Sequence, residues 1–552
     1  MKTIFLSSLF LITATCLYGQ AAVVSDTSKH TVKQDTVKHV AKLDTINPDM
    51  GNVNQQLKDI KAKKIKLHSD SIGSDSIVSQ PIKSSKVDTV MQNKYGDLLR
   101  DDSAYNKKSG IWVPFIEGIG DNTALSLIDS KVLKYDWAQV GMASWKRNLG
   151  AGFPWGPKWD WDQTRFGNDF LGHPIFGNFY FNDARCNGYS FWASAPYALI
   201  GSYWWKLFGE NITPERNSLI ATTVDGILLG EVLYRISSNI LDDRTHGTER
   251  VFREILAAMV DPMRGFNRLV QGKTCQYTNK EIYQKEPLNI TLYGGIHAIN
   301  DRSNAILSGT TSEMINLQFD YGNPFEQRTR NPFDFFKLRF ETDIGVGRKF
   351  VDNIRGYGNL IAKNVQVGKV AMLEGGFLYY DYWDNTLFEL STIAIGPGVF
   401  TKLPIGKTSN LYTNVHVGFV PFAGASPGPV SDTSQFRDFN FGYGWEAKFE
   451  TSLSLGNVAT IGVTYYYFMI HAINSVGQDE PALGSLGNNS NTIIQPKITL
   501  HIYKDMSVGF EEYFYSQVHT DDGFPTYTAV QTEQKIFIQF YFEDPQRRGH
   551  YN

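Results

Sequence analysis

The chain has 552 residues, and its 53 Lys and Arg residues nearly balance its 56 Asp and Glu residues, giving a net charge of −3 and a pI of about 6.4. This balance gives no indication of nucleic-acid binding, and a mean hydropathy of −0.27 argues against a helical membrane protein with many spans. Aromatic residues make up 14% of the chain, which is high for a soluble protein and typical of a membrane barrel with aromatic girdles.

Residues 1–20 have the features of a secretory signal peptide. Lys2 supplies the positive end, residues 4–12 form an apolar run too short to span a bilayer, and residues 17–19 resemble a cleavage site. The mature protein is therefore expected to begin near Gln20. Cys16 leaves a lipoprotein anchor as an alternative, although Thr15 is a poor residue before a lipidated cysteine.

Residues 21–108 are rich in Lys, Asp, Ser, Thr, Val and Gln and contain scarcely an aromatic residue. Such a segment cannot bury enough apolar surface to offset the entropy lost on ordering. The composition predicts a disordered periplasmic linker. Loosely repeated Asp-Thr triplets also leave open a spacer that reaches toward a cell-wall or envelope partner.

Residues 109–275 change to an aromatic-rich composition with helical segments. A short helix is expected over 131–148, and a nearly charge-free helix over 190–208. The sequence Thr213-Pro214-Glu215 predicts the start of a third helix that runs to about 241. A further helix is expected over 249–260, ending at Asp261-Pro262.

The helix beginning near Thr213 carries Asp225, Glu231 and Arg235 within an otherwise apolar run. Glu231 and Arg235 have the i,i+4 spacing of a helical ion pair. Charges of this kind are costly in lipid unless they face protein or water. The helices are therefore expected to lie in or beneath the lumen of a barrel, where polar wall residues and water would meet the charges.

Residues 287–544 show the period-two alternation of membrane strands. Leu338, Phe340 and Thr342, for example, alternate with Arg339 and Glu341. About twelve strands are expected, near 288–299, 312–321, 335–346, 355–365, 369–382, 387–400, 410–420, 438–454, 457–470, 493–503, 506–518 and 530–543. Tight turns near 368, 456 and 504 fall at one end and long loops over 421–437 and 472–492 at the other, as in bacterial outer-membrane barrels.

Residues 168–275 resemble an uncharacterised domain-of-unknown-function family of Gram-negative outer-membrane proteins. The residues that carry the resemblance are His173, Pro174, Gly177, Tyr180, Ala184, Arg185, Asn187, Gly188, Phe191, Trp192, Gly209, Glu210, Asn211, Pro214, Gly230, Glu231, Tyr234, Arg235, Asp261, Pro262, Arg264 and Gly265. Cys186 stands where a small polar residue is expected. The resemblance implies a secreted helical domain joined to an outer-membrane barrel, and it implies no established reaction.

Six ionisable residues stand in apolar surroundings in the helical segment: His173, Arg185, Glu210, Asp225, Glu231 and Arg235. They are candidates for a lumen polar cluster that binds a ligand or transfers protons. The alternative is a set of hydrogen-bonded anchors that fix the helices to the barrel wall. The anchor interpretation is preferred because buried polar groups must be satisfied whether or not there is catalysis.

An outer-membrane hydrolase of lipid A or phospholipid is an alternative function, with His173, Ser190 and Asp225 as weak catalytic candidates. No Gly-x-Ser-x-Gly motif surrounds Ser190. Neither a metal nor a cofactor is expected, because the eleven histidines are scattered and no phosphate-binding glycine loop is present. Cys186 and Cys275 either pair or stay separate thiols.

Together these features predict a membrane all-β barrel of about 12 antiparallel strands, preceded by an α-helical plug or cap domain. The expected location is the outer membrane with the N-terminal segment in the periplasm. The expected role is structural, transport or lipid-handling, and a receptor or adhesin that uses the long loops is a further alternative. The expected partners are outer-membrane lipids and the barrel-assembly machinery.

Overall fold

The computed structural model describes residues 108–543, apart from 155, 162–165, 280, 301–306, 308, 327–329, 346–349, 386–387, 427–438, 475–486 and 522–525. The expected signal peptide, with Cys16, and the expected linker up to residue 107 lie outside the described residues. The same holds for most of the two long loops, although 421–425 and 487–492 are parts of strands.

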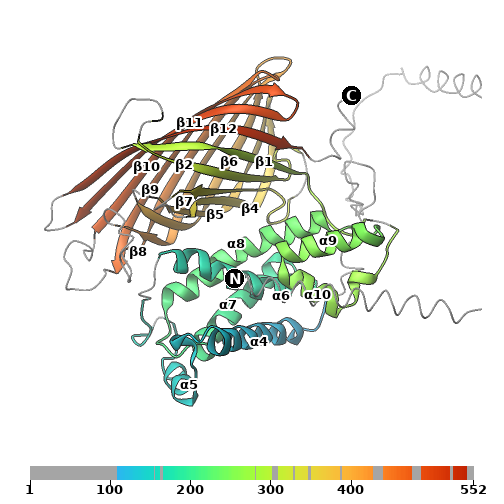
Figure 1. The fold of residues 1–552 in the computed structure, drawn as a ribbon, viewed down its shortest axis with the longest axis vertical. Helices are drawn as coiled ribbons and strands as arrows, with labels where there is room; N and C mark the ends of the chain where they lie inside the picture. The colour runs from blue at the N-terminus through green and yellow to red at the C-terminus, as the bar shows by residue number, and fades with distance from the viewer. Residues whose placement is uncertain are drawn as a thin grey trace, which may run out of the picture. The chain divides into compact units, whose positions relative to one another are not determined.

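The described N-terminal part is helical (Figure 1). Its elements are α4 (Trp112–Leu127), η1 (Ile128–Val132), η2 (Asp136–Ala138), α5 (Met142–Leu149), η3 (Asn168–Gly172), α6 (His173–Cys186), α7 (Phe191–Phe208), α8 (Arg216–Ile240), α9 (Gly247–Val260), α10 (Pro262–Val270) and η4 (Lys273–Cys275). We call these elements the helical domain. Among the described residues, none of its helices combines the length and the apolar character of a membrane-crossing helix.

Twelve antiparallel strands of the described chain form a closed barrel (Figure 1). They are β1 (Leu288–Asn300), β2 (Thr310–Tyr321), β3 (Phe336–Ile344), β4 (Val351–Val367), β5 (Val370–Asp384), β6 (Glu389–Pro404), β7 (Ser409–Ala425), β8 (Asn440–Leu455), β9 (Ala459–Asn474), β10 (Gly487–Tyr503), β11 (Met506–Asp521) and β12 (Tyr527–Phe542). Each strand pairs with its neighbours in sequence, and β1 closes on β12, where Ile290 stands opposite Phe542. The predicted fold class, a barrel preceded by a helical region, is confirmed.

The period-two pattern sorts the side chains of each strand between the lumen and the outside. On β3, Arg339 and Glu341 meet other strands' charged residues across the lumen, whereas Phe336 and Leu338 belong to an apolar cluster outside the wall. The β4–β5 pairing shifts its register between Asn359 and Ile361, where Asn359 stands opposite Phe377 and Ile361 opposite Gly376.

The two ends of the barrel differ. One end, which we call the turn end, holds tight turns in which Gly368, Gly456 and Lys504 have positive φ values of 58°, 56° and 48°. Glycine adopts this backbone without strain, and such turns allow two strands to reverse directly. The beginning of β1 and the end of β12 lie at the same end. The opposite end, the loop end, holds most of the longer connections, including 426–439, although the connection 322–335 between β2 and β3 at the turn end is also long.

The helical domain packs on the outer wall of the barrel. At the loop end, the Tyr380 hydroxyl donates a hydrogen bond to the Phe170 carbonyl, and the Trp161 ring stacks on Phe441 with 5.1 Å between centroids. At the turn end, Arg235 Nη1 lies 3.0 Å from Asp334 Oδ1. Helix α8, about 37 Å long at 1.5 Å per residue, therefore follows the wall from one end to the other.

The prediction that the helices fill or cap the lumen is wrong. Tyr380 and Tyr382 stand on the outer face of β5, yet the helices bury them, and Tyr382 is only 1% exposed. The apolar residues Ile220, Val224 and Ile227 of α8 pack into the same cluster. The wall at this place is an apolar surface, and burying it against an apolar helix is favourable.

Several helices differ from the predicted ones. The expected helix over 131–148 is two short turns and α5, and α4, α6 and α10 were not expected. The helix expected over 190–208 is α7, which Ser190 caps by accepting a hydrogen bond from the Ala193 amide. Helix α8 begins after Glu215 rather than at Thr213. Asp261-Pro262 starts α10, because the Asp261 carboxylate accepts from the Arg264 amide.

Candidate functional site in the barrel lumen

A cavity of about 680 Å³ occupies the turn end of the lumen. It is lined by the beginnings of β1, β3, β7 and β9 and by the ends of β2, β6, β8, β10 and β12, which meet at that end because successive strands run in opposite directions. Arg355 of β4 and Glu511 of β11 also line it. A volume of this size is within the range of small-molecule sites.

The lining is polar and carries an excess of positive charge. Five cationic residues and three carboxylates face the cavity, so that the cations exceed the carboxylates by two. The cations are Lys337, Arg339, Arg355, Lys402 and Lys497, and the carboxylates are Asp320, Glu450 and Glu511. Hydroxyl and amide side chains such as Thr291, Asn414 and Thr464 line the space between them.

Three of the cations are matched with carboxylates of the lining. Lys337 lies 3.5 Å from Asp320, Arg339 lies 3.4 Å from Glu450, and Lys497 lies 3.9 Å from Glu511. Within the described chain, Arg355 and Lys402 make no ion pair. Arg355 donates instead to Asn353, Gln495 and Tyr513 and lies over the Trp383 ring.

Buried charges close the lumen beyond the cavity, on the side of the loop end. Lys535 is fully buried between Glu341 and Glu533, and the His297 ring bridges Glu533 and Asp343. A second group joins Lys448 to Glu446, at 2.7 Å, and to Asp381. These buried charges are paired with one another, and they leave little room for water in this part of the lumen.

An aromatic layer adds to this closure. The lumen faces of β5, β6, β9, β10 and β11 meet in one buried cluster near the loop end, which includes Trp383, Leu390, Phe468, Ile493 and Tyr515. Trp383 has no exposed surface. The described lumen is thus a cavity open at the turn end and packed with side chains above it.

The sequence-predicted polar cluster lies in the helical domain, outside this lumen. Arg185 of α6 contacts Glu231 of α8 through two hydrogen bonds of 2.7 and 2.9 Å. Glu231 also accepts from Arg235, at 2.8 Å, and Arg235 reaches Asp334 of the barrel. Three of the candidates therefore form one ion-paired chain that joins α6 and α8 to the barrel.

Glu210 belongs to a separate group. Its carboxylate lies 2.8 Å from Lys206 Nζ, which also lies 3.0 Å from Glu215. Lys206 is the only Lys or Arg of α7, and it points into the helical domain with 2% of its surface exposed. This group joins the end of α7 to the start of α8.

The predicted catalytic set of His173, Ser190 and Asp225 is not brought together. His173 Nε2 lies 2.9 Å from Ser218 Oγ, and His173 Nδ1 lies 3.6 Å from Asp169. Ser190 is the N-cap of α7, and Asp225 is buried in α8 with no described hydrogen-bond partner for either carboxylate oxygen. Sequence reasoning missed Asp169, although its i,i+4 spacing from His173 was visible.

The Asp169–His173–Ser218 row has the residue types of a serine hydrolase, but Ser218 has no exposed surface. We expect Ser218→Ala to lower the free energy of unfolding by about 1 kcal/mol, through loss of one hydrogen bond, and to leave lipids unmodified as before. Denaturant unfolding and chromatography of extracted lipids measure the two effects. Loss of a lipid product from a normally folded variant would instead support the hydrolase.

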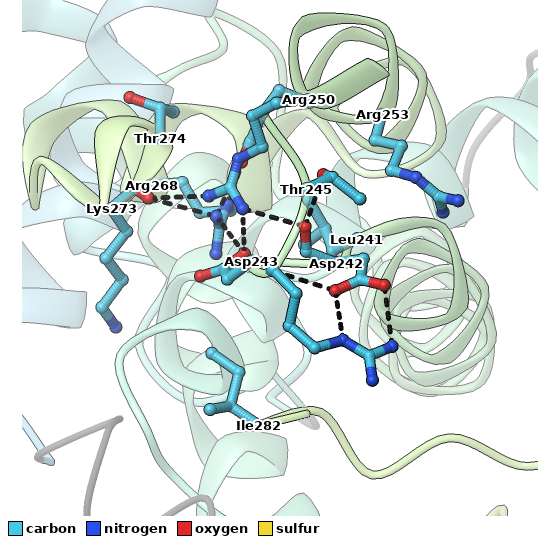
Figure 2. Close-up of polar contacts among 12 residues, drawn as sticks. Leu241, Asp242, Asp243, Thr245, Arg250, Arg253, Arg268, Lys273, Thr274 and Ile282 are labelled. Carbon is cyan, nitrogen blue, oxygen red and sulfur yellow. Dashed lines mark hydrogen bonds and ion pairs between the residues drawn. The ribbon is translucent and has the colours of Figure 1, made fainter. Parts of the chain in front are cut away.

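A dense ion cluster ties α9, α10 and the segment before β1 to the end of α8 (Figure 2). Asp243 lies 2.9 Å from both Arg250 and Arg268, and Arg268 also contacts Glu254 at 2.7 Å. Burial by itself raises the pKa of the neighbouring Asp242 carboxyl, but the hydrogen bonds and charge of Arg244 lower that pKa to about 2. Every charge of this cluster is satisfied within the protein, which indicates a structural role.

Metal binding and a disulfide receive no support from the described residues. They contain no group of three or more His, Cys, Asp or Glu side chains able to hold a metal ion. Cys186 and Cys275 are both free, so the alternative of separate thiols is the one that the structure has.

Comparison with known families addresses the helical domain. Residues 158–263 match the family model of DUF3943, a domain of unknown function. The DUF3943 region begins before η3 and ends in α10, so it contains α6, α7, α8 and α9. This confirms the resemblance that the sequence suggested to a domain-of-unknown-function family. No curated protein matches the chain.

Solved structures resemble the barrel that follows the DUF3943 region. The NanC porin matches with 9% identity and a TM-score of 0.26, covering 46% of this chain and 98% of that one. An outer-membrane channel from Pseudomonas putida F1 matches with 7% identity and a TM-score of 0.25, covering 47% and 97%. An anion-selective porin from Comamonas acidovorans matches with 9% identity and a TM-score of 0.21, covering 46% and 98%. At these identities the likeness is one of fold.

Proposed function

We propose that this chain is an outer-membrane protein whose barrel binds a small, polar, negatively charged solute in the lumen cavity and does not form an open pore. The single observation that carries the proposal is the cavity itself, which is cationic, open at the turn end and packed solid toward the loop end. A closed barrel with such a lumen can hold a solute but cannot let it diffuse through.

The outer face of the barrel supports the membrane location. Away from the helical domain, β9, β10 and β12 expose Ile461, Ile498 and Ile538 to the surroundings. An apolar band around a closed barrel is what hydrocarbon contact requires, and closure leaves no unpaired strand edge in the lipid. Short turns face the periplasm in such barrels, which would open the cavity to the periplasm. Insertion would then make the barrel-assembly machinery a partner.

The charges of the cavity support an anionic solute. Arg355 and Lys402 have no carboxylate partner among the described residues, so an incoming carboxylate or phosphate would not have to displace one. Threonine, asparagine and glutamine side chains around them match the hydroxyl groups of a sugar-like molecule. A carboxylated or phosphorylated monosaccharide is the class that we propose.

Calorimetric titration of the full-length protein with glucuronate, and with glucose as the uncharged comparison, tests the proposal. We expect glucuronate alone to bind, and Lys402→Met to weaken that binding about tenfold or more, because a hydrogen bond to a charged group contributes about 1.5–3 kcal/mol. Lys363→Met is the matched control, since it removes an exposed lysine that pairs with Glu374 on the outer face.

Planar-bilayer recordings of the same preparation complete the test. A packed lumen predicts no steady ionic conductance from the reconstituted protein. Steady open-channel currents would contradict the non-conducting barrel. Equal binding of glucose and glucuronate, or equal affinities for the Lys402 and Lys363 variants, would contradict the anionic site.

A further inference from the structure

Two helices of the helical domain, α7 and α4, bury polar side chains and expose apolar ones. On α7, Ser194, Ser202 and Lys206 face inward and are almost fully buried, while Trp192 and Leu199 are about half exposed, at 59% and 48%. At these positions α7 buries polar side chains and exposes apolar ones, which is the reverse of a helix on the surface of a water-soluble protein.

Helix α4 has the same arrangement. Its inward face carries Asn122, whose side chain donates to the Gly201 carbonyl of α7, and Glu117, whose carboxylate accepts from Asn187 at 2.6 Å. Its outward face carries Trp112 and Ile116, which are 70% and 64% exposed. Large exposed apolar faces of this kind on two neighbouring helices need a partner that is itself apolar.

The contact between α6 and α8 also has the character of a helix pair in lipid. Gly226 and Gly230 of α8 stand four residues apart, and α6 lies against both, through Gly177 and Phe181. A Cβ atom added to Gly226 would lie 2.4 Å from the Gly177 Cα atom. Small residues spaced in this way let two helix backbones approach closely, which is the common packing of helices in membranes.

The position of the helical domain on the barrel indicates the environment of its outward face. The domain follows the outer wall from the Trp161–Phe441 contact at the loop end to the Arg235–Asp334 contact at the turn end. It therefore lies at the height at which the uncovered strands expose Ile498 and Ile538. Its apolar face continues the apolar band of the barrel.

We propose that the outward faces of α4 and α7 contact the acyl chains of the outer membrane, so that the helical domain lies within the bilayer beside the barrel. The proposal rests on the barrel's own location in that membrane, which is part of the proposed function. Hydrocarbon is the occupant that fits, because the exposed residues of both faces are uncharged and these faces continue the apolar band of the barrel.

Site-directed spin labelling of the full-length protein in lipid nanodiscs tests this. Single cysteines at Ile116 of α4, Leu199 of α7, Ile538 of β12 and Lys407 of a turn are introduced into a background without native cysteines, made by Cys16→Ser, Cys186→Ala and Cys275→Ser. Collision rates with oxygen, which concentrates in hydrocarbon, and with a water-soluble nickel chelate are compared at each position. We expect Ile116, Leu199 and Ile538 to favour oxygen several-fold over Lys407.

The four positions separate the two proposals. If Ile538 favours oxygen but Ile116 and Leu199 favour the nickel chelate, the helical domain lies in water and the inference is overturned while the barrel location stands. If Ile116 and Leu199 are shielded from both reagents, another protein surface covers them and the inference is again overturned. If Ile538 favours the nickel chelate, the barrel location itself fails. Labels at two helix positions are used, so that the test can still be made if one of the two variants misfolds.

Discussion

Replacing Glu231 by alanine should lower the free energy of unfolding of the helical domain by about 3–5 kcal/mol. Glu231 is fully buried and is the shared partner of Arg185 and Arg235. Its removal would leave Arg185 without a carboxylate and Arg235 with Asp334 alone, and an uncompensated buried charge is far more costly than the pair is favourable. Urea unfolding followed by tryptophan fluorescence, in the detergent that keeps the barrel folded, measures the change.

Glu249→Ala is the matched control for this prediction. Glu249 also pairs with an arginine four residues along a helix, Arg253, but the side chains are 58% and 33% exposed. Exposed pairs of this kind contribute about 0.3–0.5 kcal/mol. Similar losses for the Glu231 and Glu249 variants would show that the chain from Arg185 to Asp334 does not anchor the helices.

Gly177→Ala should lower the free energy of unfolding by about 3 kcal/mol or more. This is the upper end of the usual cost of overpacking. A Cβ atom at this position would lie 1.6 Å from the Thr222 carbonyl oxygen, so that α6 and α8 would have to move apart. That movement would also lengthen the Arg185–Glu231 contact, which joins the same two helices. Gly226→Ala adds a methyl group at the same helix contact from the side of α8, and it should lower the free energy of unfolding by a similar amount.

Gly120→Ala provides the comparison. Gly120 lies within α4, and a Cβ atom added there meets nothing within 4 Å. Alanine is favoured over glycine inside a helix by about 0.5–1 kcal/mol, so this variant should be slightly more stable than the parent. Unfolding midpoints in urea for the three variants check the prediction, and a Gly177 variant as stable as the parent would refute the tight helix contact.

The barrel could be predicted from the sequence because its signals are local. Each strand repeats with period two, and positions such as Gly368, Gly456 and Lys504 mark turns that need only a few neighbouring residues to recognise. The observed strands are mostly within a few residues of the expected ones, and the largest differences, near 421–425 and 487–492, are strand ends that continue into regions rich in Gly, Ser and Asn.

The placement of the helices could not be predicted in the same way. The expectation of a lumen location rested on the cost of Asp225 and Glu231 in lipid, and the i,i+4 partner Arg235 was visible. Arg185, however, is 46 residues from Glu231, and Asp334 is 99 residues from Arg235. These partners satisfy the charge of Glu231 inside the protein, so this residue needs no water-filled lumen. Asp225 is buried in α8 and has no such partner among the described residues. No local pattern indicates such pairs.

The lumen site was visible only in part. The alternation of Lys337, Arg339 and Glu341 with apolar residues indicated that charges face inward. Which of these charges close the lumen and which line a cavity depends on pairs made across the barrel, such as Arg339 with Glu450 and Lys535 with Glu341. The two cations without a carboxylate partner, Arg355 and Lys402, could therefore not be singled out.

The contacts that hold the helical domain on the wall have a consequence for biogenesis. Phe170 and Tyr380, which share a hydrogen bond, are 210 residues apart, and the wall on which the helices dock is made of strands that emerge later in synthesis. Contacts this distant in sequence form late. The helical segment must therefore wait, undocked, until strands β3 to β8 have paired. We expect the barrel-assembly machinery to hold this amphipathic segment and to release it only when the closed barrel provides the surface on which the helices dock.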